Sequence, residues 1–65
     1  MLDVNALKAE MVKNGYTQAK LAEEIGISPR TLSNKLKTGD FGNKEMEVII
    51  NVLSIKDPMS IFFAK

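Results

Sequence analysis

Cysteine and histidine are both absent from this sequence of 65 residues. Without cysteine there can be no disulfide, and without either residue the usual zinc ligands are missing. These two residue types also supply many nucleophiles and general bases, and no glycine-rich phosphate loop stands in their place. The sequence therefore predicts a protein that is not an enzyme, with no metal, cofactor or small-molecule substrate.

Long apolar runs are absent as well. No stretch approaches the roughly 20 apolar residues that a bilayer-spanning helix needs, and no basic segment followed by an apolar one stands at the N-terminus. We therefore expect a cytoplasmic protein without a membrane partner. A chain of 65 residues can bury one small core, so we expect residues 1–65 to form a single domain.

The net charge indicates little about a partner, because nine basic residues balance eight acidic ones to leave +1. The distribution of charge is more informative, since contact with phosphate needs positive charge on one surface. Between Ser28 and Thr38 the chain carries Arg30, Lys35 and Lys37 and no acidic residue. This segment is therefore the first candidate for contact with nucleic acid.

Apolar residues recur at spacings of three and four, which indicates helices, and no stretch alternates as a strand would. The residues that cap helix starts are Thr17, Ser28 and Asp57, the last two followed by proline. Gly42 or Asn43 caps a further helix, with Glu45 placed to complete a capping box if Gly42 is the cap. We predict an all-α fold of five helices, at about 5–13, 18–25, 29–37, 43–53 and 58–63.

The join between the second and third predicted helices is the most informative part of this pattern. Gly26 ends one helix and Ser28 starts the next, so the two helices are too closely connected to lie antiparallel. They must cross steeply, and Ala22 offers only a methyl group where they approach. The pattern predicts a helix-turn-helix.

The third predicted helix has an apolar and a polar side at about 100° per residue. Leu32 and Leu36 share the side that should pack inward. The opposite side is free of carboxylates and holds Arg30, Asn34 and Lys37, with Thr31, Ser33 and Thr38 at its flanks. Arginine and lysine suit guanine or phosphate and asparagine suits adenine, which predicts that this side contacts double-stranded DNA in the major groove. Contacts to the DNA backbone are expected from Gln18, Lys20, Asn43 and Lys44.

At these residues the sequence resembles the lambda-repressor-like helix-turn-helix family, the Cro and repressor proteins of the XRE type. The similar segment is TQAKLAEEIGISPRTLSNKLKTG, followed by phenylalanine, the stretch KEMEVIINVL and the ending DPMSIFF. The resemblance covers nearly the whole chain and implies a five-helix DNA-binding domain. It also implies that Gln18 helps to hold a phosphate and the recognition helix, and that the recognition positions are Ser28, Pro29, Arg30, Thr31, Ser33 and Asn34.

Two features depart from the family pattern. Pro29 stands where many members have a side chain that can read a base, so base reading should shift to Arg30 and Asn34. The stretch from Lys35 to the glycine that follows it is longer than is common, which affects where Lys37 and Thr38 make contact.

Large apolar residues crowd the C-terminal turn, where Ile61, Phe62 and Phe63 follow one another. They cannot all face inward from one turn, and an exposed apolar patch often marks an interface. Because helix-turn-helix proteins commonly pair to span two half-sites, we predict a homodimer through Met59, Phe62 and Phe63. The alternative is that Ile61 and Phe62 close the core while Phe63 frays.

These patterns together predict a sequence-specific DNA-binding transcriptional regulator, a phage-type or prophage-type repressor similar to Cro. The alternative is a protein-interaction module on the same scaffold, such as an antirepressor or a partner-binding regulator. The polar and basic side of the third helix argues against this alternative, which an acidic or apolar side would have favoured.

Overall fold

The computed structural model describes residues 1–64 and contains five helices and no strand within that range. The helices are α1 (Val4–Lys13), α2 (Gln18–Ile25), α3 (Pro29–Thr38), α4 (Asn43–Leu53) and α5 (Pro58–Phe62). The predicted all-α, five-helix class is therefore confirmed. Helices α2 and α4 have the predicted bounds, whereas α1 starts one residue earlier, α3 ends one residue later and α5 ends one residue earlier.

Each helix begins where the sequence supplies an acceptor for its free N–H groups. The side chains of Asp3, Thr17, Ser28 and Asp57 each accept a hydrogen bond from a backbone N–H in the first turn of α1, α2, α3 and α5. Asp3 explains why α1 starts earlier than predicted, since its carboxylate accepts from the N–H of Ala6 at 3.0 Å. Gly42 is the cap of α4, and the carboxylate of Glu45 accepts from the Gly42 N–H at 2.9 Å.

Two glycines end the helices on either side of the helix-turn-helix. Gly26 follows α2 with φ +89°, and Gly39 follows α3 with φ +72°, a left-handed backbone that other residues rarely adopt. At Gly39 there is also little space, because an added Cβ would lie 3.2 Å from the Cβ of Leu2. Gly39 is therefore required both by backbone conformation and by the close approach of the N-terminal segment.

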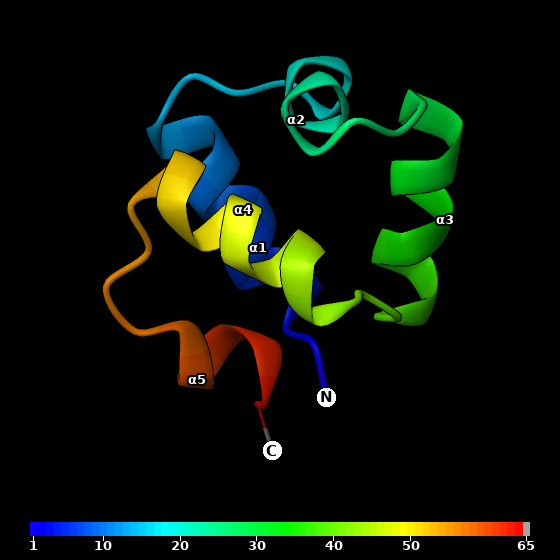
Figure 1. Ribbon diagram of the computed structural model, residues 1–65. Coiled ribbons are helices and arrows are strands. Elements are labelled where there is room, and N and C mark those ends of the chain that lie inside the picture. The colour runs from blue at the N-terminus through cyan, green and yellow to red at the C-terminus, as the bar shows by residue number, and fades with distance from the viewer. Residues whose placement is uncertain (65) are drawn as a thin grey trace.

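One hydrophobic core lies between the helices. Its largest fully buried side chains come from four of them and are Leu7, Leu21, Leu32, Ile49 and Leu53. Figure 1 shows α2 and α5 at opposite ends of the molecule, α1 and α4 between them, and α3 along one edge. Helix α2 packs against both α3 and α4, and α5 packs against α1. The fold thus leaves one long side of α3 facing away from every other helix.

The crossing of α2 and α3 has the close contact that the sequence predicts. Ala22 is fully buried, and its carbonyl oxygen accepts from the N–H groups of Gly26 and Ile27 at 2.8 and 3.0 Å. Ile25, the last residue of α2, is partly buried and packs against the core. Among residues 1–64, no helix is both long enough and apolar enough to span a membrane.

Candidate nucleic-acid interface

Helix α3 separates its apolar and polar residues as predicted. Leu32 and Leu36 are 0% and 3% exposed and lie in the core. Arg30, Asn34 and Lys37 are exposed on the other side. The side chains of these three residues have no hydrogen bond or ion pair to the rest of residues 1–64, so their donors remain available to an external acceptor.

The N-terminal end of α3 leaves a second donor available. The Ser28 hydroxyl oxygen accepts from the Thr31 N–H at 3.1 Å, and the Ser28 hydroxyl donates to the Thr31 hydroxyl oxygen at 2.9 Å. Ser28 is therefore committed to capping the helix, whereas the hydroxyl proton of Thr31 stays free. Pro29 is exposed beside them and has no N–H to satisfy.

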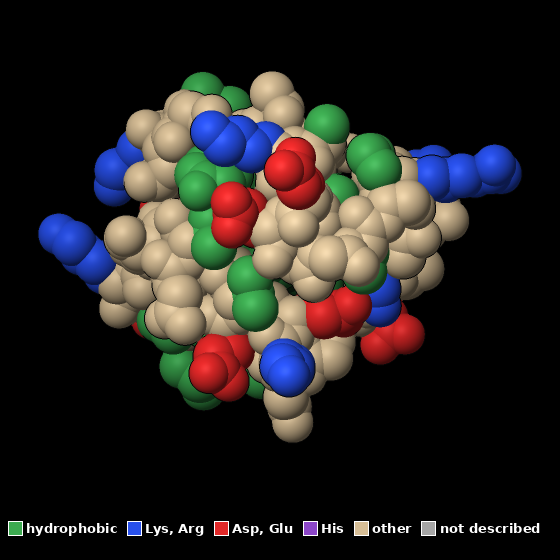
Figure 2. Space-filling model, turned by 45° about the horizontal axis from the view of Figure 1, so that its top comes forward, with side chains coloured by type: hydrophobic (Ala, Val, Ile, Leu, Met, Phe, Trp, Pro, Cys, Tyr) green, Lys and Arg blue, Asp and Glu red, His purple; other side chains and the backbone are tan. Residues whose placement is uncertain are grey.

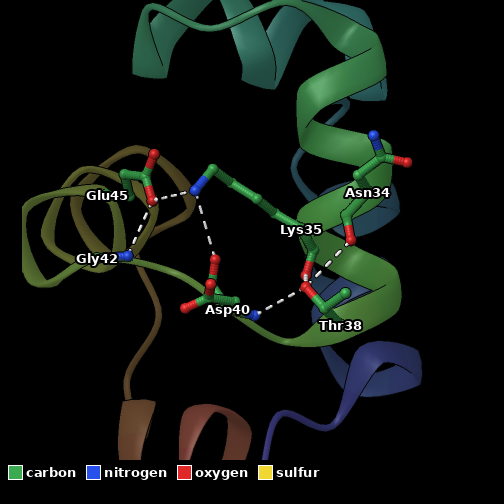
Figure 3. Close-up of polar contacts among 6 residues, drawn as sticks. All are labelled: Asn34, Lys35, Thr38, Asp40, Gly42 and Glu45. Carbon is green, nitrogen blue, oxygen red and sulfur yellow. Dashed lines mark hydrogen bonds and ion pairs between the residues drawn. The ribbon is translucent and has the colours of Figure 1, made fainter.

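The C-terminal end of α3 uses its hydroxyl group internally. Thr38 is exposed, but its hydroxyl donates to the carbonyl oxygen of Asn34 at 3.2 Å and accepts from the N–H of Asp40 at 3.3 Å (Figure 3). The hydroxyl proton that a phosphate would need is therefore bound to the helix backbone. The helix extends one residue beyond its predicted end because Gly39 is its C-terminal cap, with the Gly39 N–H donating to the carbonyl oxygen of Lys35 at 2.7 Å.

Lys35 lies at the centre of a polar cluster that the sequence pattern did not predict. Its ammonium nitrogen lies 3.2 Å from a carboxylate oxygen of Glu45 and 3.4 Å from the carbonyl oxygen of Asp40, as Figure 3 shows. The side chains of Lys35 and Glu45 are only 27% and 22% exposed. Lys35 therefore compensates an acidic side chain and adds little free positive charge to the surface of α3.

The same cluster shifts the protonation of Glu45. The hydrogen bond from the Gly42 N–H lowers the pKa of the Glu45 carboxyl, partial burial opposes this lowering, and the hydrogen bond and charge of Lys35 add to it. The carboxylate is thus ionised at neutral pH and holds Lys35 and Gly42 at once. Only the bond to Gly42 follows from a local motif, because Lys35 lies ten positions away along the chain.

The start of α2 lies against the middle of α3. Gln18 and Ser33 are half-buried, and together with Lys37 and Lys8 they line a shallow depression of about 200 Å³. The structure therefore brings together three predicted contact residues from two helices. It adds Lys8 of α1, which sequence analysis missed because α1 carries no part of the motif.

The remaining predicted contacts are exposed at helix starts. Lys20 lies in the first turn of α2, with its ammonium nitrogen 5.3 Å from the centre of the Tyr16 ring, a cation–π contact that restricts the side chain. Asn43 and Lys44 are exposed in the first turn of α4. Figure 2, which turns α2 toward the viewer, shows basic and acidic side chains interspersed over this side of the molecule, with basic ones also projecting from its left and right edges.

The C-terminal turn divides its apolar residues between core and surface. Phe62 is 6% exposed and meets Phe41 edge to face, with ring centres 6.4 Å apart. The ring of Phe62 therefore closes the core beside α4 and also lines the groove between α4 and α5, and its place in a dimer interface stays a prediction. Met59 and Phe63 are 64% and 57% exposed, and Ile61 is buried.

An apolar groove of about 330 Å³ lies between α4 and α5. Its apolar lining includes Met46, Ile50, Met59 and Phe63. Met46 and Ile50 lie on α4 with the core residues Ile49 and Leu53, yet both are only partly covered. The groove therefore exposes apolar surface that the residues described here do not cover.

A family model described as "Helix-turn-helix" matches residues 7–34. The matched segment runs from the middle of α1 through α2 to Asn34, so it includes the whole join between α2 and α3. No curated protein and no solved structure matches the chain.

Proposed function

We propose that the chain is a sequence-specific repressor of the phage or prophage kind, similar to Cro, and a member of the helix-turn-helix family of the XRE, lambda-repressor-like type, a proposal supported by the family model that matches residues 7–34. The family is one of DNA-binding transcriptional regulators. On our proposal, the protein occupies an operator in the cytoplasm and so blocks transcription.

The observation that carries the proposal is the outward side of α3. Arg30, Asn34 and Lys37 are exposed, make no side-chain bond within the described chain and have no carboxylate beside them on the helix. A duplex in contact with this side would find only donors and neutral groups. Arg30 can donate two parallel hydrogen bonds to guanine, and Asn34 can pair with adenine through its amide.

Contacts around α3 would fix the register of the protein on the duplex. We propose that Gln18, Lys20, Asn43 and Lys44 contact phosphates, because they are placed at the starts of α2 and α4 on either side of α3. Ser28 and Thr38 contribute less than the sequence predicts, since their hydroxyl groups are bonded within the protein. Thr31 and Ser33 would make contacts at the flanks of the reading helix.

The proposal is tested by selecting bound sites from random DNA pools and titrating the enriched site at two salt concentrations. Arg30→Ala and Asn34→Ala should each weaken binding to that site by roughly 1–3 kcal/mol. Arg30→Lys should lose most of the same free energy, because lysine keeps the charge but lacks the planar fork. Lys56→Ala removes a charge from the loop before α5 and should change specific binding little. Weak binding that is equal for all four variants and depends only on salt would refute sequence-specific recognition.

We further propose that two copies associate through the groove between α4 and α5. Met59 and Phe63 are largely exposed there beside the partly covered Met46 and Ile50. Asn43, a proposed phosphate contact, also lines the groove, so a copy seated in it would lie next to the surface that meets DNA. A twofold pair could then read two half-sites about one DNA turn apart.

Sedimentation equilibrium tests this association. Phe63→Asp should shift the protein toward monomer, whereas Val12→Asp places the same charge on an exposed residue of α1 and should leave the equilibrium unchanged. A parent protein that stays monomeric at every concentration, alone and on an operator with two half-sites, would refute the homodimer.

A further inference from the structure

The pair formed by Lys35 and Glu45 joins two helices that have little other direct contact. Helix α2 packs against both α3 and α4, whereas α3 and α4 are connected to each other mainly by residues 39–42. The chain has nine basic and eight acidic residues, yet this is the one ion pair between them in residues 1–64. It bridges the last turn of the reading helix and the first turn of the next helix.

The pair lies between two groups of proposed DNA contacts. Arg30, Asn34 and Lys37 project from α3, and Asn43 and Lys44 project from the start of α4. A rigid duplex meets both groups at one angle between the two helices, and affinity is highest when that angle is fixed before binding. Otherwise the binding free energy would include the cost of ordering the joint.

We propose that Lys35 and Glu45 are positioning residues that hold α4 at the angle to α3 at which both groups of contacts meet one duplex. The Glu45 carboxylate binds the Lys35 ammonium group and the Gly42 N–H, while Lys35 also donates to the Asp40 carbonyl group. The connecting residues are therefore held at two backbone positions and at both helix ends. This inference rests on the proposed function, because it assigns a role in that same interface.

The negative charge of Glu45 allows the positioning role to be distinguished from simple repulsion of DNA. If Glu45 were only an acidic residue near the interface, its removal would strengthen binding to phosphates by reducing repulsion. If it positions α4, its removal weakens binding. Glu45→Gln separates the two effects, since glutamine keeps an oxygen that can accept from the Gly42 N–H but loses the charge that holds Lys35.

The experiment is a double-mutant cycle on affinity for the selected DNA site, with Lys35→Met, Glu45→Gln and the combined variant. Each single substitution should weaken binding roughly two- to fivefold, the range expected for a partly exposed pair. The combined variant should bind no more weakly than either single variant, because each residue acts through the other. Glu24→Gln removes the same charge from an exposed, unpaired residue of α2 and should leave affinity unchanged or slightly raised.

Three results would overturn the positioning role. The first is that the two single substitutions have additive effects on affinity. The second is that Glu45→Gln binds DNA as tightly as Glu24→Gln. The third is that Lys35→Met lowers the salt dependence of binding by about one phosphate contact, whether residue 45 is glutamate or glutamine. The last result would show that Lys35 touches DNA itself.

A measurement without DNA keeps the two proposals separate. Residual dipolar couplings of backbone amides in α3 and α4 report the angle between the helices in the free protein. Glu45→Gln should change the mean angle between α3 and α4 or widen the range of angles that the protein adopts. Thermal unfolding shows whether the variant is folded. If the parent protein selects no DNA site, the repressor proposal fails, and an unchanged angle in Glu45→Gln would separately refute the positioning role.

Discussion

The two ends of α3 are built from similar residues but use them differently. At the N-terminal end, Ser28 caps the helix alone, and the side chains of Arg30 and Thr31 keep protons available to an external partner. At the C-terminal end, Lys35 and Thr38 direct their donors to Glu45, Asp40 and the helix backbone. The N-terminal end therefore leaves donors free, whereas at the C-terminal end Lys35 and Thr38 are bonded within the protein and, among its donors, Lys37 stays free within residues 1–64.

This difference shows why residue type alone does not identify a contact residue. Lys35 and Lys37 are two positions apart and carry the same charge, yet only Lys37 is exposed and unpaired within residues 1–64. Availability depends on what the following helix places within reach, which here is the carboxylate of Glu45.

The largest effect is expected from the leucines that fix both ends of α3 to the core. Leu32→Ala should destabilise the protein by roughly 2–5 kcal/mol, because its side chain is fully buried and leaves a cavity. Leu36→Ala should cost a similar or smaller amount, since Leu36 is slightly exposed. Urea unfolding followed by circular dichroism measures both. A loss below 1 kcal/mol for Leu32→Ala would contradict the buried position.

Substitution by alanine should lower the free energy of unfolding by different amounts at the glycines before and after α3. Alanine in a left-handed conformation loses roughly 1–2 kcal/mol at either position. Gly26 has open space around the added Cβ, whereas at Gly39 the Cβ would press against Leu2. Gly39→Ala should therefore destabilise the protein more than Gly26→Ala in thermal unfolding. Equal losses would show that the N-terminal segment can move away from Gly39.

The hydroxyl groups at the two ends should also differ. Ser28→Ala removes a helix cap and should cost about 1 kcal/mol of stability. Thr38→Val keeps the shape of the side chain and should cost roughly 0.5 kcal/mol or less, because the groups it leaves are exposed to water. Chemical denaturation gives both values. A larger loss for Thr38→Val would mean that the C-terminal turn depends on its hydroxyl more than on its ion pair.

The smallest of these effects on stability is expected from acid, which should remove the contribution of Glu45 to the free energy of unfolding. The folded-state pKa of Glu45 lies below its ordinary value of 4.5, so ionised Glu45 stabilises the folded state above that pH. This contribution is lost as pH falls below about 4.5 and through the folded-state pKa. The stability difference between the parent and Glu45→Gln should therefore shrink as pH falls from 6 to about 3. A difference that stays constant over this range would argue against a lowered pKa.

Much of the fold could be predicted from the sequence because its signals are local. A cap, a following proline and an ending glycine lie within a few residues of the boundary they determine, so Ser28, Pro29 and Gly39 indicate α3 directly. The division of α3 into two sides also follows from helical spacing alone. These signals place Arg30 and Asn34 on the surface without any knowledge of the other helices.

The surroundings of three residues could not be predicted, because they depend on contacts between different helices. The sequence shows Lys35 only as one basic residue of the segment from Ser28 to Thr38, because its partner Glu45 lies on the next helix. The burial of Phe62 depends on its edge-to-face contact with Phe41, which the spacing of residues in the C-terminal turn does not show. Lys8 was missed because only the packing of α1 brings it beside Gln18. In each case the contact joins residues far apart in the sequence, and residue spacing along one helix does not show which helices pack together.

The separation of roles along α3 has a consequence for retargeting the protein. Two leucines attach the helix, while Arg30, Asn34 and Lys37 have no bond to the rest of the described chain. Substitutions at these three positions can therefore be screened as a library with little penalty in expression yield. From the amino-acid sequence alone, Lys35 and Thr38 resemble these three polar residues of α3. Such a library should nevertheless leave Lys35 and Thr38 unchanged, because both are bonded within the protein.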